Sequence, residues 1–390
     1  MTQRQPRLNA RLQGLGTTVF AAMSALAEAT GSINLGQGFP DYDGPIEVLE
    51  AARRAIGEGH NQYPPGRGIK ALREAISEHQ RHFYGLEYDP AAEVLVTIGA
   101  TEAIAATILA LCELGDEVVM FEPYYDVYPA VTAMAGATHR VVRLNPPDWS
   151  FDPDELRRAI TARTRLVIVN TPHNPTGKVF DRRELEILAE VCNEHDLIAV
   201  TDEVYEHLVF DGEHLALATL PDMRDRTVTV SSAAKTFSVT GWKIGWLCAS
   251  PSFVAAIQTA KQFLSFAGGT PFQVAIAAGL GLPDERIRAV CADLEMRRDR
   301  FCGGLAELGH DVTAPRSGYF AITDVGSLGG LDAAEFCATL PERCGVVAIP
   351  NHVFYDHKDE ARRLVRWAFC KTTDTIDQAL GRLATLSPQR

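Results

Sequence analysis

The chain has 390 residues, more than the roughly 250–300 over which one hydrophobic core grows, so we expect one large and one smaller domain. Apolar residues make up 46% and charged residues 22%, a composition that excludes a disordered chain. The net charge of −13, without any basic stripe, argues against a nucleic-acid partner.

The N-terminal segment, the longest apolar run and the cysteine spacing together indicate the cellular compartment. Residues 1–12 are polar and basic without an apolar core, so no signal peptide is expected. The longest apolar run, residues 103–112, is shorter than the ~18–20 residues that cross a bilayer, so no membrane span is expected. The cysteines are scattered without a Cys-x-x-Cys pair, which predicts buried reduced thiols in a cytoplasmic protein and no metal site: Cys112, Cys192, Cys248, Cys291, Cys302, Cys337, Cys344 and Cys370.

The first two thirds of the chain predict an α/β fold with a mainly parallel sheet. Short apolar runs alternate with helical patterns, which places helices on both faces of such a sheet. Strands are predicted at residues 94–98, 117–121, 166–170, 197–201, 227–231 and 242–248, and helices at 101–113, from about 126, and at 183–195. Because functional groups collect at the carboxyl ends of parallel strands, the site is expected there.

The C-terminal third reads as a smaller α+β domain. It contains a charged helical pattern at residues 284–305 and short strands around 319–322, 346–349 and 364–369. We expect the segment before Pro40 to join it. The predicted division is therefore 41–282 for the large domain and 1–40 with 283–390 for the small one.

Lys235 follows a predicted buried strand in the run Ser231-Ser232-Ala233-Ala234-Lys235. Lysine is almost never fully buried without a partner, so this position favours a chemical role. A lysine that reaches solvent from the strand end is the plain alternative. Ser232 and Lys235 also match the Ser-x-x-Lys pattern of penicillin-binding hydrolases, but the Ser-Asp-Asn and Lys-Thr-Gly elements of that class do not occur.

Two further strand ends carry polar groups. Asp202 closes the run 197–201, with Tyr205 three residues later. A buried carboxylate must be paired or its pKa rises, and a protonated pyridine nitrogen is a suitable partner; a helix N-cap is the structural alternative. In Asn170-Thr-Pro-His-Asn174-Pro-Thr-Gly177 the prolines and glycine form a rigid turn that can aim Asn174 inward, or a turn with no further role.

Anion-binding groups complete the pattern. Gly99-Ala100-Thr101 joins a strand to a helix, whose free N–H groups suit a phosphate, and Ser232 and Lys243 could add contacts. Arg366 interrupts the apolar strand 364–369 and by alternation faces away from its neighbours. Its planar guanidinium suits a carboxylate ligand; a structural ion pair is the alternative.

With these motifs in order, the chain resembles the class I/II aminotransferases of fold type I, which depend on pyridoxal 5'-phosphate. The resemblance implies a large domain with a mainly parallel seven-stranded sheet covered by helices, and a smaller α+β domain. The resemblance runs from about Asn34 to the C-terminus. The stretches that carry it are Asn34-Leu-Gly-Gln-Gly-Phe-Pro-Asp41, Gln62-Tyr63-Pro-Pro-Gly66, Gly99-Ala-Thr-Glu102, Glu122-Pro-Tyr-Tyr-Asp126, Asn170 to Gly177, Asp202-Glu-Val-Tyr205, Ser231 to Lys235, Thr240-Gly-Trp-Lys-Ile-Gly245 and Val365-Arg-Trp.

The resemblance implies a role for each matching residue. Lys235, Asp202 and Tyr205 are the implied catalytic groups: Lys235 carries the cofactor covalently and moves the substrate proton, and Asp202 pairs with the pyridine nitrogen. The implied cofactor contacts are the ring oxygen to Asn174 and Tyr205, ring stacking by Tyr125, and the phosphate to Ala100, Thr101, Ser232, Lys243 and, from the second subunit of a homodimer, Tyr63. The implied substrate contacts are Arg366, Asn174, the Gly38 backbone and Phe20.

Within the family, the motif Gly-Gln-Gly-Phe-Pro-Asp resembles that of the kynurenine and methionine aminotransferases. The chain resembles the N-succinyldiaminopimelate aminotransferases of lysine synthesis still more closely. Phe20 stands where kynurenine enzymes have a tryptophan over the substrate, and this difference weakens the case for an aromatic substrate. Arg67 could meet a distal carboxylate from the partner subunit, or be a solvated loop arginine.

The expected function is therefore transamination between N-succinyl-LL-2,6-diaminopimelate and the 2-oxoglutarate/glutamate pair. A kynurenine- or methionine-type aminotransferase and a cysteine-conjugate β-lyase are the alternatives. A cofactor-sensing transcription factor would need a DNA-binding domain, for which the roughly 30 residues before the first motif are too few.

Overall fold

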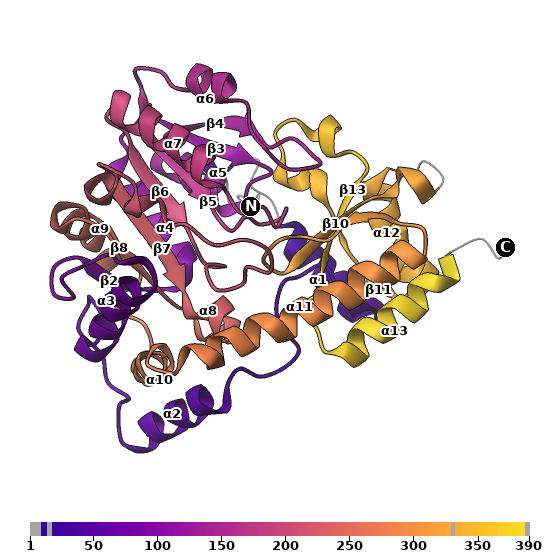
Figure 1. Cartoon of the computed structure of the whole chain (residues 1–390), viewed down its shortest axis with the longest axis horizontal. Coiled ribbons are helices and arrows are strands. Elements are labelled where there is room, and N and C mark those ends of the chain that lie inside the picture. The colour runs from indigo at the N-terminus through magenta and orange to yellow at the C-terminus, as the bar shows by residue number, and fades with distance from the viewer. Residues whose placement is uncertain (1–8, 14–17, 329–331, 387–390) are drawn as a thin grey trace, which may run out of the picture.

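The computed structural model describes residues 9–13, 18–328 and 332–386; the basic stretch 1–8 lies outside these ranges. The described chain forms a large sheet with its covering helices and a smaller region beside it (Figure 1). None of the eight cysteines is bonded to another. No helix in the described ranges combines the length and apolar character that a membrane crossing requires.

The large sheet has seven strands in the order β2-β8-β7-β6-β5-β3-β4. Strands β3 to β7 pair in parallel, and β8 is antiparallel to both β2 and β7, so the predicted, mainly parallel sheet is confirmed. The edge strand β4 had not been predicted. The bounds are β2 Val94–Ile98, β3 Glu117–Glu122, β4 Thr138–Arg143, β5 Thr164–Asn170, β6 Ile198–Asp202, β7 Thr227–Ser232 and β8 Ile244–Cys248.

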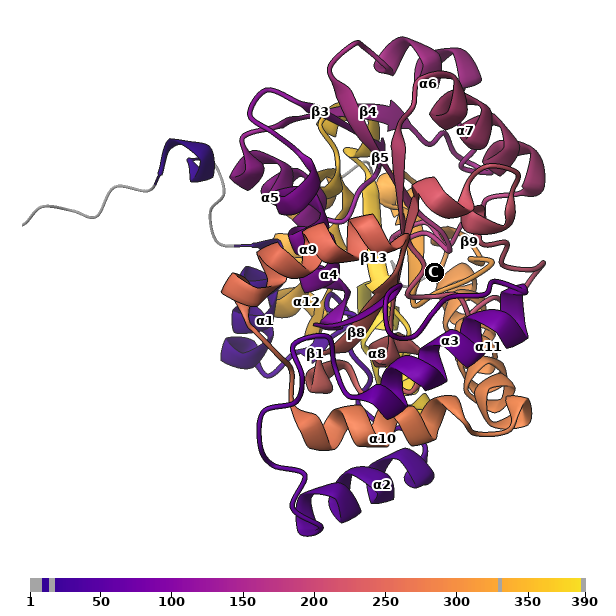
Figure 2. The ribbon, with the colours of Figure 1, turned by 90° about the vertical axis from the view of Figure 1, so that its left-hand side faces the viewer.

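Helices cover both faces of this sheet because its central strands are apolar on both sides. One face packs against α4 (Gly99–Leu111), α5 (Val127–Ala135) and α9 (Pro251–Leu264). The other packs against α3 (Lys70–Tyr84), α6 (Pro153–Ala159), α7 (Arg182–Glu194) and α10 (Thr270–Leu280). Helix α10 lies between α3 and α2 (Ile46–Gly57), as Figure 2 shows.

The smaller region is built on a four-stranded sheet, β12-β13-β10-β9, and a parallel pair, β1 with β11. Its long helix α11 runs from the α10 side of the molecule to α13 (Figure 1). The bounds are α1 Val19–Thr30, β1 Ile33–Asn34, α11 Asp284–Glu307, β9 Asp311–Thr313, β10 Phe320–Asp324, α12 Ala333–Cys344, β11 Val346–Val347, β12 Ile349–Pro350, β13 Leu364–Ala368 and α13 Thr373–Leu383. Pairing of β1 with β11 links the segment before Pro40 to this region, while the boundaries at 40/41 and 282/283 stay a prediction.

Several predicted strands begin or end one or two residues away from the observed bounds, and two of the differences change the local structure. The run 346–349 is two short strands in different sheets, since β11 pairs with β1 and β12 with β13. The run 242–248 begins as a strand only at Ile244, because Lys243 adopts the left-handed conformation with φ 55°. That backbone turns the Lys243 side chain toward Gly99, where an added Cβ would lie 3.3 Å from Lys243 Nζ.

Candidate active site

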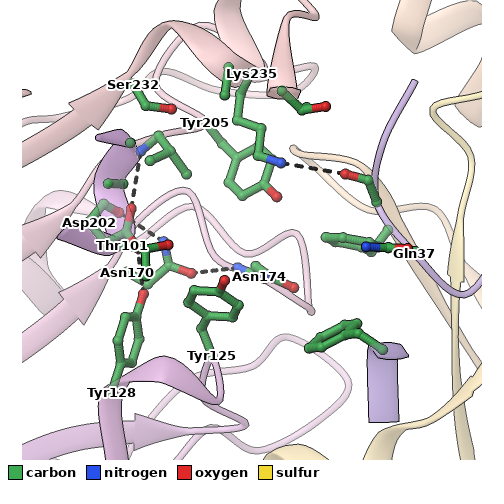
Figure 3. A pocket seen from close by; sticks show the side chains of 18 of the residues that line it. Gln37, Thr101, Tyr125, Tyr128, Asn170, Asn174, Asp202, Tyr205, Ser232 and Lys235 are labelled. Carbon is green, nitrogen blue, oxygen red and sulfur yellow. Dashed lines mark hydrogen bonds between the residues drawn. The ribbon is translucent and has the colours of Figure 1, made fainter. Parts of the chain in front are cut away.

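A cavity of about 290 Å³ lies where β2, β5, β6 and β7 end, beside the smaller region (Figure 3). The parallel strands bring together residues that are far apart in the chain. All predicted site residues except Tyr63 and Arg67 line it: Phe20, Gly38, Ala100, Thr101, Tyr125, Asn174, Asp202, Tyr205, Ser232, Lys235, Lys243 and Arg366. The prediction that the site lies at the strand ends therefore matches the cavity's position.

Lys235 reaches into this cavity from the short helix α8 (Ala233–Thr236), directly after β7. Its Nζ lies 3.5 Å from the Gly38 carbonyl and 5.0 Å from the ring centroid of Tyr319, and the described residues form no ion pair with it. Desolvation lowers the pKa of Lys235 to about 8. A sizeable neutral fraction near neutral pH makes the amine a nucleophile, and its position contradicts a lysine that merely reaches solvent.

Asp202 is the last residue of β6 and is 4% exposed. Its Oδ2 accepts a hydrogen bond of 2.7 Å from the Tyr128 hydroxyl, and Val204 N lies 3.4 Å from Oδ1. A turn, not a helix, follows, so the N-cap alternative does not apply. Burial raises the pKa of Asp202 to about 6, which is the expected effect on a carboxylate without a cationic partner within bonding distance. A protonated ring nitrogen would supply that partner.

Asn170 fixes the turn that presents Asn174. Its Nδ2 donates to the carbonyls of Asp202 (2.8 Å) and Pro172 (3.1 Å), and its Oδ1 accepts from Asn174 N (2.7 Å). The turn after β5 is thereby bonded to the end of β6. Asn174 then points its side chain into the cavity (Figure 3).

The start of α4 forms an anion cradle. Ile98, at the N-cap position, gives no side-chain cap, so the first N–H groups of the helix are available to a ligand. A Cβ on Gly245 would lie 2.4 Å from Gly99 C, so only glycine lets β8 pack this close to the turn. Ser232, 2% exposed, and Lys243 add a hydroxyl and a positive charge, a donor set that fits a phosphate.

Arg366 is buried, at 1% exposed, on β13. Its Nη2 donates to the Gly36 carbonyl (2.8 Å) and its Nη1 to Asn174 Oδ1 (3.3 Å). Its guanidinium carbon lies 4.0, 4.8 and 5.1 Å from three phenylalanine ring centroids: Phe320, Phe354 and Phe20.

No carboxylate of the described residues forms an ion pair with Arg366, so the structural ion-pair alternative is wrong, and desolvation lowers its pKa to about 10. Its Nε also lacks a hydrogen-bond partner among these residues. A buried guanidinium without a counterion is costly, and a ligand carboxylate would compensate it.

A second cluster of polar side chains is bonded to the turn after β6 through Glu206 and His207. Glu206 accepts hydrogen bonds from Tyr84 (2.6 Å) and from Ser231, the neighbour of Ser232. His79 and His207 bond through their Nε2 atoms at 2.6 Å. Both carboxylate oxygens of Glu206 therefore have a donor from the chain, and Glu206 ties the turn after β6 to the end of β7.

Two predicted contacts lie elsewhere. Tyr63 is 87% exposed and outside the cavity, with its ring 5.8 Å from that of Phe266. Arg67 donates to Gln258 Oε1 (2.5 Å) and to the Ala91 carbonyl (2.7 Å), so it is bonded to its own chain and is not a solvated loop arginine, while its contact with a distal carboxylate stays a prediction.

Eight cavity residues had not been predicted as contacts: Gln37, Gly99, Tyr128, Asn170, Val204, Ala234, Thr240 and Phe320. Gln37 and Asn170 lie inside motifs that had been singled out, and Tyr128 lies one helical turn after Tyr125. Only Phe320, on a strand of the smaller region, lies in or near no motif that would have pointed to it.

Comparison with known proteins places this site in context. The profile of the family "Aminotransferase class I and II" matches residues 30–383. The probable N-succinyldiaminopimelate aminotransferase DapC of Mycobacterium tuberculosis is 51% identical over 97% of this chain and 98% of its own. The methionine aminotransferase of Escherichia coli is 39% identical over 96% and 97%. The solved structure of the M. tuberculosis N-succinyldiaminopimelate aminotransferase matches with a TM-score of 0.95, over 97% of this chain and 100% of that one.

Proposed function

This chain belongs to the class I and II aminotransferases and catalyses pyridoxal-phosphate-dependent transamination, and we propose that its substrate pair is N-succinyl-LL-2,6-diaminopimelate with 2-oxoglutarate/glutamate. That assignment gives it a step in lysine synthesis through diaminopimelate. The observation that carries the proposal is the buried, unpaired guanidinium of Arg366 in the same cavity as the reactive amine of Lys235. The 51% identical relative supports the choice of substrate.

The donors that line the cavity fit the cofactor. We assign Lys235 to its covalent attachment and Asp202 to its ring nitrogen. The remaining proposed contacts are Asn174 and Tyr205 to the ring oxygen, Tyr125 to the ring face, and Ala100, Thr101, Ser232 and Lys243 to the phosphate. When bound, pyridoxal phosphate supplies an electron sink for the negative charge that develops at the substrate Cα.

The chain's own residues position the substrate and move its proton. Arg366, with Asn174 and the Gly38 backbone, binds the α-carboxylate and so fixes the Cα near Lys235. The Lys235 amine, with its pKa lowered to about 8, takes the proton from Cα. Phe20 and Phe320 flank Arg366 and keep water from the bound carboxylate, which strengthens that bond.

We further propose a homodimer in which Tyr63 reaches the phosphate of the second subunit. Tyr63 is 87% exposed and its ring lies 5.8 Å from that of Phe266, and in the segment of Phe266 the side chains of Phe263, Leu264 and Phe266 are 83%, 49% and 43% exposed. Large exposed apolar side chains of this kind are typical of a protein interface. Burial against a second copy would cover them.

Mixing two inactive variants tests the shared site. In a dimer of Lys235→Ala and Tyr63→Ala subunits, one site receives both intact residues, so mixing should restore up to about a quarter of wild-type activity at limiting cofactor. Activity no greater than the sum of the separate variants would contradict the shared site. Equilibrium sedimentation of the wild type gives the oligomeric state directly.

A panel of amino donors tests the substrate. With 2-oxoglutarate as acceptor, kcat/KM for N-succinyl-LL-2,6-diaminopimelate should exceed that for kynurenine and methionine by at least about 10-fold. A preference for kynurenine or methionine would replace the proposed substrate. Release of pyruvate and ammonia from cysteine conjugates, faster than amino transfer, would instead identify a β-lyase.

A further inference from the structure

Gln37 occupies the side of the cavity away from the cofactor-binding groups. Figure 3 shows it across the cavity from Asp202 and Thr101. Gln37 and Phe20 are half-buried, whereas Asp202, Ser232 and Arg366 are 4%, 2% and 1% exposed. A substrate held by Arg366 and Lys235 therefore has to extend its side chain toward the more open side, where Gln37 lies.

A chain of hydrogen bonds fixes which end of the Gln37 amide faces this space. Asn34 Oδ1 accepts from the backbone N–H groups of Gly36 (3.0 Å) and Gln37 (3.1 Å). Since backbone N–H groups only donate, the atom that they contact must be the Asn34 oxygen, and its nitrogen must point the other way.

The next two hydrogen bonds determine the orientation of the Gln37 side-chain amide. Asn34 Nδ2 donates to Ser24 Oγ (3.4 Å), and the Ser24 hydroxyl donates its proton to Gln37 Oε1 (2.6 Å). The amide oxygen of Gln37 is thus used, and its Nε2 has no partner among the hydrogen bonds of the described residues. What remains is a pair of N–H donors at the open side of the cavity.

We propose that Gln37 Nε2 selects substrates with a carbonyl or carboxylate oxygen in the side chain. The inference rests on the proposed function, because it assigns the substrate class of the same site. A neutral amide donor binds both the charged tail of glutamate and the amide or carboxylate of a longer acyl tail. One residue can thereby serve both substrates of a reaction that alternates between them.

Single-turnover kinetics of Gln37→Leu test the proposal. The donors are L-glutamate, N-succinyl-LL-2,6-diaminopimelate and L-norleucine, whose tail has no acceptor, and the signal is the cofactor absorbance. Loss of a hydrogen bond to a polar tail should lower kcat/KM for the first two by about 10-fold or more, through KM. For norleucine the change should stay within about twofold.

Two variants separate the donor from a structural effect. Gln37→Glu keeps the bond from Ser24 but presents an acceptor, so tailed donors should lose at least as much as in Gln37→Leu. Ser24→Ala removes the bond that fixes the amide, so the same donors should lose about threefold. Thr30→Val, on the exposed face of the same helix, is the matched control and should behave as wild type.

A binding measurement gives a readout independent of turnover. The cofactor-loaded protein is titrated calorimetrically with glutarate and with valerate. Gln37→Leu should bind glutarate more weakly than the wild type does, whereas the Kd for valerate should be the same in both. Equal losses for tailed and untailed ligands, or no loss, would overturn the role of Gln37. Wild-type protein that transfers no amino group from any of the three donors would refute the proposed function, while the glutarate–valerate contrast still decides the inference.

Discussion

Two sets of buried charges in this molecule are held in opposite ways. Away from the cavity, Glu117 at the start of β3 accepts hydrogen bonds from Thr161 (2.7 Å) and Arg163 (3.1 Å), and Lys178 lies 2.7 Å from Glu184. Inside the cavity, Lys235 and Arg366 form no ion pair with any described carboxylate.

The pKa values follow this difference. Burial by itself would raise the pKa of Glu117, but the bonds from Arg163 and Thr161 hold it below its usual range. For Asp202, burial prevails and raises the pKa to about 6. Partners supplied by the chain stabilise the fold, whereas charges left without a counterion are completed by a ligand of opposite charge. The comparison predicts that mutations of the paired charges outside the cavity change the stability of the fold, whereas mutations of the charges inside the cavity change catalysis or substrate binding.

The largest contrast is between Lys235 and Lys178. Lys235→Ala should lower turnover by at least about 10⁴-fold, because the nucleophile and proton carrier are lost, and should abolish the visible cofactor absorbance. Lys178→Met should keep the absorbance but lose about 3 kcal/mol of unfolding free energy, since it leaves the mostly buried Glu184 without its positive partner. Turnover assays and urea denaturation measure the two effects. A Lys235 variant that kept both absorbance and turnover would break the comparison.

The two carboxylates give the next contrast. Asp202→Asn should leave cofactor binding largely intact but lower kcat by about 10²–10³-fold, because an amide cannot hold a proton on the ring nitrogen by its charge. Glu117→Gln should leave kcat unchanged and lower the denaturation midpoint. An undiminished kcat in Asp202→Asn would exclude its pairing role.

For the arginines the expected effect is on affinity. Arg366→Gln should raise the KM of amino donors by about 100-fold, because the guanidinium that binds the α-carboxylate is gone. The cofactor-free variant should be no less stable than wild type, since an uncompensated buried charge is removed. Arg163→Gln is the matched control and should leave KM unchanged. An unchanged KM in Arg366→Gln would mean that the substrate carboxylate binds elsewhere.

The smallest effect is a pH dependence of stability. The folded pKa of Lys235, about 8, is below the ordinary lysine value of 10.5, so between these pH values the unfolded chain binds more protons and stability rises with pH. Cofactor-free Lys235→Met should therefore exceed wild type in stability most clearly below pH 8, and the difference should shrink toward pH 10.5. Urea denaturation at pH 7 and pH 10 measures it. A difference that grows with pH would show that the folded pKa is not depressed.

Much of this arrangement could be predicted because strand ends are visible in a sequence. Lys235, Asp202 and Asn174 each follow an apolar run, and parallel pairing brings such positions together. The edge strand β4 escaped prediction because its side chains are mostly half-buried and the run is not continuously apolar. The orientation of the Gln37 amide depends on bonds between α1 and the loop after β1, which no local pattern encodes.

The cofactor site is tested most directly by the position of the covalent bond. Cofactor-free protein is loaded with pyridoxal phosphate, reduced with borohydride and digested with trypsin, which does not cleave after a modified lysine. The label should appear on one peptide that runs from Thr227 to Lys243, with Lys235 as the uncleaved residue. A label on any other lysine, or protein that stays colourless with the cofactor, would contradict the account.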